Sequence, residues 1–368
     1  IVPKILPNAW GGIVPPITFP NRHVLIEKYM AQNQWQSLAD GATVLDIGCG
    51  FPPLTSADMA ARFPLVNFIG ADPSFGKYTV SDAEGNYACI LEDGNLKYMQ
   101  PANISTHHWN DVFDDLESTK SKFLGMFRQL LSHLPAAESP NESEIFSMNG
   151  MKITRNPLHQ YVRANLSFMQ EGIGSNALPY NLDMIRCMNV LLYFDPPFRA
   201  YTLAWAAEHL KEGGLFICGL NYAQSVNGRF SVYQKQHGKM VLQEFAFSLD
   251  NIRPSEIVTF YNFRSDDFEQ DNLMRLVAIL RSDNHFMQSF NAGFDSLLEQ
   301  NKICSRKPDG YLGFIDVAAP PGELQLSMQR TTLQLGDAFG QQAAAVLQSA
   351  GLNAWVNDIG FIGVSLPG

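Results

Sequence analysis

The apolar positions of the chain form two patterns, short continuous runs and longer stretches with a helical spacing. Residues 42–47 and 65–71 are short apolar runs that predict buried strands, and residues 56–63 between them predict a helix. Two further strands are predicted at Leu182–Met188 and Leu215–Gly219. Strands that alternate with helices are typical of a parallel sheet with helices on both faces. The pattern therefore predicts an α/β fold built on a doubly wound sheet.

Two more helices follow from capping signals and spacing. Asp195 and Pro196 open a helix that runs to about Leu210, because aspartate suits an N-cap and proline suits the first turn. Across residues 109–134 the apolar positions recur every three or four residues, which predicts an amphipathic helix. We place this helix in an inserted helical segment of about residues 106–145.

Changes in pattern divide the chain into three parts. Residues 1–40 contain a Pro- and Gly-rich arm and a lead-in helix, and residues 41–254 form the sheet domain with its insertion. Residues 255–368 predict a small C-terminal α+β region that caps the sheet domain or mediates oligomerisation, with a homodimer as one expectation. Its predicted elements are helices at 268–280, 286–298 and around 343–347, strands at 311–317, 324–328 and 354–366, and a turn at 357–360.

Composition narrows the classes of partner. The net charge of -10 and the absence of a Lys/Arg cluster argue against a nucleic-acid surface, which needs a basic face. The five cysteines form no CxxC pair, so neither a zinc site nor a disulfide framework is predicted. No apolar run reaches the roughly 20 residues of a membrane span, and the start of the chain lacks a signal-peptide pattern. We therefore expect a cytoplasmic protein that binds no metal, membrane or nucleic acid.

The loop after the first predicted strand carries the clearest chemistry. Asp46 lies in the strand, and the loop that follows reads Gly48-Cys49-Gly50. Glycines allow a ligand to approach the backbone closely, because no Cβ stands in the way. Asp72 follows the second strand, 22 residues after Gly50, where an acid can accept both hydroxyls of a ribose. Asp46 is placed to reach the aminoacyl end of such a ligand or to order water beside it.

Two other interpretations compete with a nucleotide-like ligand at this loop. A dinucleotide site needs the three glycines of GxGxxG, and the third position here is Pro53, so that fingerprint fails. A plain glycine turn without a ligand is the second alternative. The strand before the loop and Asp72 after the next strand favour a nucleotide-like ligand over a bare turn.

The loop and the acid resemble those of class I methyltransferases, which implies a Rossmann-like fold and S-adenosyl-L-methionine as cofactor. The core is further similar to the chemotaxis-receptor glutamate methyltransferases, over about 75 residues and more loosely over 41–220. That similarity rests on Asn165-Leu166, on the strand and loop from Asp183 to Phe194, and on Gly213-Gly214-Leu215. It implies that Asn165, Leu166 and Asn189 line the cofactor site and that Tyr193 faces the transferred methyl group. The alternatives are an aromatic plug for Tyr193 and a turn role for Asn189.

The chain departs from that family on the acceptor side. Met188 stands where the family has arginine, and Phe51-Pro52-Pro53-Leu54 replaces an acidic stretch. Only about 40 residues precede the predicted sheet, so we expect no helical receptor-docking domain like that of the family. Asp195-Pro196-Pro197-Phe198 resembles the signature of amino-group methyltransferases, but it follows the strand end at Asn189 by six residues, and a helix cap explains it better.

The acceptor is left open by the sequence. A neutral acceptor would need a general base, and His107 with His108 is the first candidate, at a predicted lid position before the insertion. His159 and His237 are further candidates, and a structural role is the alternative for each histidine. The leading hypothesis is methyl transfer to the O, N or S atom of a small-molecule substrate. The alternatives are a protein carboxylate methyltransferase and a non-catalytic module that binds the cofactor.

Overall fold

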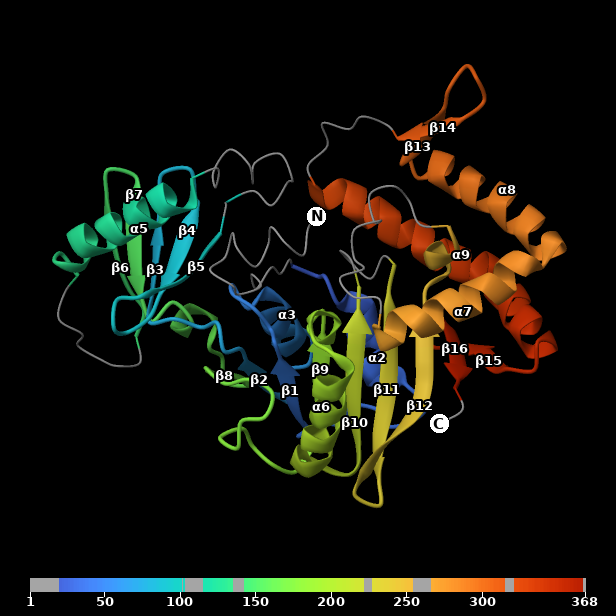
Figure 1. Cartoon of the computed structure of the whole chain (residues 1–368), viewed down its shortest axis with the longest axis horizontal. Coiled ribbons are helices and arrows are strands. Elements are labelled where there is room, and N and C mark those ends of the chain that lie inside the picture. The colour runs from blue at the N-terminus through green and yellow to red at the C-terminus, as the bar shows by residue number, and fades with distance from the viewer. Residues whose placement is uncertain are drawn as a thin grey trace.

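The computed structural model describes residues 20–100, 102, 115–134, 142–221, 227–253, 266–314 and 321–366. Figure 1 shows three regions: a central sheet, a smaller sheet beside it and a group of C-terminal helices. The central sheet has nine strands in the order β15-β16-β12-β11-β10-β9-β1-β2-β8. Its parallel part consists of β8 (Leu166–Met169), β2 (Asn67–Ala71), β1 (Thr43–Ile47), β9 (Leu182–Met188) and β10 (Leu210–Leu220).

The chain crosses from strand to strand through helices on opposite faces of this sheet. α3 (Leu54–Arg62) joins β1 to β2, and α6 (Pro196–His209) joins β9 to β10. One face packs on α3 and on the lead-in helix α2 (Val24–Gln32), and the other packs on α6. The strand order reverses between β1 and β9, which is the arrangement of a Rossmann-like sheet. The predicted doubly wound α/β fold is confirmed.

Local signals explain where α6 begins. The Asp195 carboxylate accepts a hydrogen bond from the Phe198 amide at 3.0 Å, and Pro196 occupies the first turn. An aspartate cap satisfies one of the amide groups that a helix start leaves unpaired, and proline has no amide to satisfy. The helix-cap interpretation of Asp195-Pro196-Pro197-Phe198 is therefore confirmed.

The insertion is larger than predicted and is not only helical. Between β2 and β8 lies a five-stranded antiparallel sheet in the order β5-β4-β3-β7-β6. Its strands are β3 (Tyr78–Ser81), β4 (Tyr87–Ile90), β5 (Leu96–Gln100), β6 (Glu144–Met148) and β7 (Met151–Arg155). The expected amphipathic helix is α5 (Leu116–Leu131), which packs through Phe123, Met126, Phe127 and Leu130 on this sheet. Several of these strands are only partly buried, so they lack the continuous apolar runs that mark β1 and β2 in the sequence.

The C-terminal region extends the central sheet as well as covering it. Two antiparallel strands, β11 (Arg229–Gln236) and β12 (Lys239–Phe247), follow β10, and β15 (Asn353–Val356) and β16 (Ile362–Ser365) complete that edge. The helices are α7 (Phe268–Ser282), α8 (Asn284–Gln300) and α9 (Pro321–Ser349), with the hairpin β13 (Cys304–Arg306) and β14 (Leu312–Phe314) between α8 and α9. The strand predicted at 324–328 is wrong, because those residues belong to the helical repeat of α9.

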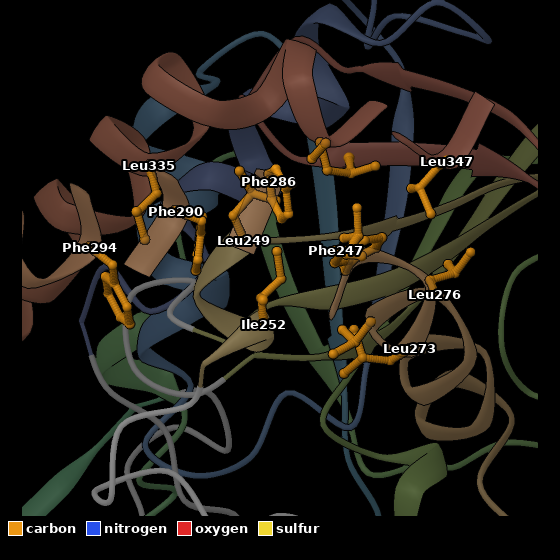
Figure 2. Close-up of a cluster of buried hydrophobic side chains, with 14 of the residues drawn as sticks. Phe247, Leu249, Ile252, Leu273, Leu276, Phe286, Phe290, Phe294, Leu335 and Leu347 are labelled. Atoms are coloured by element: carbon orange, nitrogen blue, oxygen red, sulfur yellow. The ribbon is translucent and has the colours of Figure 1, made fainter. Parts of the chain in front are cut away.

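A single apolar cluster joins these helices to the sheet. Phe247 from β12 and Leu249 and Ile252 from the short helix η4 (Leu249–Ile252) meet side chains of α7, α8 and α9 (Figure 2). Phe245 lies in the same cluster and is fully buried. The aromatic residues of β12 thus form core rather than the wall of a ligand pocket. No helix in the described ranges is long and apolar enough to cross a membrane.

Glu244 connects distant parts of the chain at this edge of the sheet. Its carboxylate is fully buried and accepts hydrogen bonds from Tyr29 Oη at 2.6 Å, Trp35 Nε1 at 3.1 Å and Asn357 Nδ2 at 2.9 Å. Burial raises the pKa of Glu244, and these donors oppose the rise because they stabilise the ionised form. The lead-in helix, β12 and the last hairpin are therefore held by one carboxylate.

Asp250 in η4 makes folding stability depend on pH. Burial raises the pKa of Asp250 from 3.8 to about 6, and hydrogen bonds from Ser248 and the Asn227 amide oppose that rise. At pH values between the unfolded pKa of 3.8 and the folded pKa of about 6, Asp250 binds more protons in the folded protein than in the unfolded chain. The contribution of Asp250 to stability is therefore complete at acidic pH and is lost as pH rises towards about 6.

We predict that Asp250→Asn flattens this dependence. The quantity of interest is the unfolding free energy of the variant minus that of the native chain. This difference should rise by roughly 2–3 kcal/mol from pH 4 to pH 7, since each pKa unit corresponds to about 1.4 kcal/mol. Urea unfolding of both proteins at the two pH values measures the difference, in which the other titrating groups cancel. Parallel pH profiles for the two proteins would contradict the prediction.

Candidate functional site

The carboxyl ends of four parallel strands meet at one edge of the central sheet. β1 leads into Gly48, β2 into Asp72, β9 into Asn189 and β10 into Asn221. Register fixes this arrangement, because Ile47 lies opposite Ala71 and Met188 lies opposite Gly219. Open α/β sheets bind ligands at such an edge, beside the point where the strand order reverses. The structure thus brings the glycine loop, Asp72 and Asn189 together, as the sequence predicts.

The glycine loop has a backbone that only glycine adopts without strain. Gly48 and Gly50 have φ angles of +74° and +72°, in the left-handed region. The Gly48 amide donates to the Ala71 carbonyl at 2.7 Å, which ties the loop to the end of β2. A Cβ at Gly48 would stand 2.3 Å from Cγ2 of Val190, so the segment after β9 packs directly on the loop.

Asp72 is held by the loop and by its own turn. Its Oδ2 atom accepts from the Gly50 amide at 2.9 Å, and its Oδ1 atom accepts from the amide and the hydroxyl of Ser74. Burial raises the pKa of Asp72, while these three donors favour the ionised form and oppose the rise. A carboxylate has about four acceptor positions. One acceptor position on Oδ2 is therefore left for a donor from a ligand. The sequence predicts that Asp72 accepts two ribose hydroxyls, but this conformation has room for one.

Asn189 forms a reciprocal pair with Asn221, which the sequence analysis did not select. Asn189 Nδ2 donates to Asn221 Oδ1 at 3.3 Å, and the Asn221 amide donates to Asn189 Oδ1 at 3.0 Å. Asn189 has a φ of +60°, which asparagine tolerates better than most residues. Tyr193 ends the short helix η2 (Leu191–Tyr193) that follows Val190, and it is half-buried. Both residues thus belong to the segment that packs on Gly48.

Asp46 is engaged inside the protein rather than at the edge. Arg186 of β9 donates to both of its oxygens, from Nε at 2.9 Å and from Nη2 at 2.6 Å. The hydroxyl of Ser56 on α3 donates to Oδ2 at 2.6 Å. Arg186 also pairs with Glu27 of α2 at 3.4 Å, and Glu27 pairs with Arg62 of α3. Asp46 therefore holds the frame beneath the glycine loop.

Cys49 lies in an aromatic cluster that joins the loop to the inserted sheet. Its neighbours include Phe51, Phe75 and Phe168, and the hydroxyl of Tyr87 on β4 donates to the Phe51 carbonyl at 3.0 Å. Burial raises the pKa of the Cys49 thiol well above its ordinary value, with Asp46 and Asp72 adding to the effect. The thiol is thus a neutral packing group.

Asn165 and Leu166 lie at the amino ends of the parallel strands, whereas the glycine loop lies at their carboxyl ends. They stand at the start of β8, where Leu166 pairs with Phe68. Asn165 Nδ2 donates to the carbonyls of Ala60, Phe63 and Val66, between the last turn of α3 and the start of β2. The structure therefore does not bring them to the site, because the length of β8 separates them from the carboxyl ends of the strands. There the Asp72 amide donates to the Met169 carbonyl at 3.2 Å.

Of the histidines suggested as general bases, His159 lies in the short helix η1 (His159–Tyr161) that precedes β8. His107 and His108 lie outside the described residues. His237 occupies the β11–β12 turn at the opposite edge, where its amide contacts Glu212. Two residues without a sequence signal, Arg22 and His23, lie beside Asn221: Asn221 Nδ2 donates to the Arg22 carbonyl at 2.8 Å. Burial, with Arg186 and Arg22, lowers the pKa of His23 well below its ordinary value, so this histidine is neutral.

Within the described ranges no group of three or more His, Cys, Asp or Glu side chains is arranged to hold a metal ion. Arg186 forms a buried charge network beneath the loop with Asp46 and Glu27. It is fully buried, and its two carboxylate partners are buried as well. Such a network stabilises a fold only while all its members are present, because an unpaired charge in the interior is costly.

Comparison with known proteins gives structural neighbours only. No protein family and no curated protein matches the chain by sequence. An O-methyltransferase family 2 protein from Planctomyces limnophilus, in complex with apigenin, is 12% identical over 54% of this chain, with a TM-score of 0.24, and the chain spans 37% of that protein. An S-adenosylmethionine-dependent methyltransferase from Clostridium acetobutylicum is 14% identical over 63% of this chain and 67% of its own, with a TM-score of 0.25. PKMT2 from Rickettsia typhi with AdoHcy is 14% identical over 96% of this chain and 54% of its own, with a TM-score of 0.27.

We predict that Arg186→Met lowers the unfolding free energy by about 3–5 kcal/mol, because Asp46 would stay buried without its counter-charge and Glu27 would keep only Arg62. Lys211→Met is the matched control. Lys211 pairs with Asp183 at the surface, and loss of such a pair costs at most about 1 kcal/mol. Urea unfolding at neutral pH measures both variants. A similar loss for the two would show that the buried network has no special weight.

Proposed function

We propose that this chain is an S-adenosyl-L-methionine-dependent methyltransferase. The observation that carries the proposal is the left-handed glycine turn at the end of β1, hydrogen-bonded through Gly50 to the buried Asp72 at the end of β2. This pair stands beside the reversal of strand order, where open α/β sheets bind nucleotide-like ligands.

The residues at this edge fit the cofactor. Gly48 and Gly50 leave the loop backbone open to close approach, and the free acceptor position of Asp72 suits a ribose hydroxyl. Asn189, held by Asn221, would line the site on the β9 side. When bound, the cofactor supplies an activated methyl group on a sulfonium.

The work left to the protein is placement. Methyl transfer is an in-line displacement, so the chain has to hold the acceptor close and aligned and keep water away. Asn189 and Tyr193 belong to the segment after β9, whose Val190 packs on the glycine loop. This position suits both side chains to contact the methyl acceptor. The buried Arg186 network beneath the loop keeps these strand ends in register.

A small molecule is the proposed acceptor. The net charge of -10 opposes a nucleic-acid substrate, and Met188 stands where the chemotaxis-receptor enzymes have arginine. A protein carboxylate is the second candidate, favoured by the run from Asn189 to Tyr193 that resembles those enzymes. The cytoplasmic location and a homodimer stay predictions.

The cofactor site is tested by titration with S-adenosylhomocysteine. We expect saturable binding to the native chain and binding weakened about 10- to 100-fold in Asp72→Asn, because hydrogen bonds to a charged group are each worth about 1.5–3 kcal/mol. Asp82→Asn is the matched control, a buried carboxylate of the inserted sheet that accepts from Asn86 and Lys122. Isothermal titration calorimetry measures all three. Absence of binding to the native chain would overturn the proposal.

The acceptor class is tested with labelled cofactor. After incubation of the protein with lysate and methyl-labelled S-adenosyl-L-methionine, we expect the label in an extractable small-molecule fraction. Base-labile label on protein would instead support the carboxylate candidate, since methyl esters hydrolyse in base. Asp72→Asn serves as the control for label that the enzyme does not transfer.

A further inference from the structure

Arg229, the first residue of β11, is a buried cation without a partner in the described part of the chain. Its side chain is 5% exposed, and its Nε atom has neither solvent nor a hydrogen-bond acceptor. No carboxylate of the described ranges lies within ion-pair distance of it. An unpaired buried charge is costly, so chains retain one mainly where it serves a ligand.

The register of the sheet places Arg229 at the same edge as the glycine loop. Arg229 pairs with Leu220, the last residue of β10, and Asn221 follows directly. β11 is the third strand from β1, and neighbouring strands lie about 4.8 Å apart, so roughly 14 Å of sheet edge separates Arg229 from the loop. The Asn189–Asn221 pair lies between them. A small molecule that contacts both the glycine loop and the guanidinium therefore has to cross the Asn189–Asn221 pair.

The nearby carboxylates are already committed to other groups. Glu269 of α7 accepts from Arg199 Nη1 at 2.6 Å and from the Ser231 hydroxyl at 2.7 Å. Asp267 caps α7 by accepting from the Gln270 amide at 2.7 Å. They act on Arg229 only through space, and burial lowers the pKa of its guanidinium despite their attraction.

We propose that Arg229 binds a carboxylate group of the methyl acceptor, so that the substrate is a small organic acid; this rests on the proposed methyltransferase function. A guanidinium presents paired donors that match the two oxygens of a carboxylate. A monoanion suits the site better than a phosphate, because one cation beside Asp267 and Glu269 cannot balance a dianion. Arg229 is an anchor that leaves another group of the substrate to accept the methyl.

The first test needs no substrate. Removal of an unpaired buried charge should stabilise the protein, so Arg229→Met is expected to raise the thermal unfolding midpoint by a few degrees. Arg199→Met is the matched control from the same cluster. It leaves Glu269 without its counter-charge and should lower the midpoint. A lowered midpoint for Arg229→Met would mean that Arg229 is structural and would overturn the proposal.

The second test uses benzoate as the probe, with benzamide and phenyl phosphate as comparisons. Benzoate is expected to bind the native chain, and its binding should weaken at least about 10-fold in Arg229→Met. Arg229→Lys keeps the charge but not the paired donors, so its affinity should fall between the two. No binding of benzoate to the native chain, equal binding of benzamide, tighter binding of phenyl phosphate, or unchanged binding in Arg229→Met would each overturn the proposal.

These results are separable from the cofactor test. Arg229→Met should bind S-adenosylhomocysteine as the native chain does, because Arg229 is three strands away from the glycine loop. If the native chain binds benzoate but not S-adenosylhomocysteine, the proposed function fails while the anion site stands. If it binds S-adenosylhomocysteine but not benzoate, only the anchor fails.

Discussion

The buried guanidinium of Arg186 is the interaction on which the rest of the structure depends. It lies on β9 and binds Asp46 on β1, the neighbouring strand, and it reaches Glu27 on α2. Ser56 and Arg62 bring α3 into the same network. Two strands and the two helices of one face therefore share one set of charges. In a medium of low dielectric such a set tolerates little displacement, since each member needs all its partners.

The site inherits its geometry from this frame. β1 and β9 end directly above the network, and their continuations are the glycine loop and the segment of Asn189 and Val190. The loop itself adds little packing of its own. It is kept in its left-handed form by bonds to Ala71 and Asp72 on one side and by contact with Val190 on the other. A ligand that enters here meets a backbone already shaped for it, which reduces the entropy lost on binding.

The sequence predicted those parts of the molecule that depend on local pattern. β9 has the predicted bounds, and the cap at Asp195 could be deduced because cap chemistry involves only neighbouring residues. Asn165 was expected at the site because a motif shows order along the chain but not which end of a strand it occupies. Arg229 and Asn221 were not predicted as site residues. Their place beside the carboxyl ends of the parallel strands follows from strand register, and residue spacing in the sequence does not reveal register. Strands β3 to β5 of the inserted sheet were not predicted, because they contain polar residues between their apolar ones and pair with strands that are not all adjacent in the sequence.

The three donors of Glu244 carry a consequence for how the chain is made. Two of them, Tyr29 and Trp35, are synthesised long before Glu244, but the third, Asn357, follows it by more than a hundred residues. β16 also pairs with β12 only after that interval. During synthesis, β12 therefore stays without its neighbour β16, and Glu244 stays without one of its three donors, until the last residues are made. Until residues 353–365 are made, the β12 edge exposes unpaired backbone groups, and such an edge is able to pair with another chain.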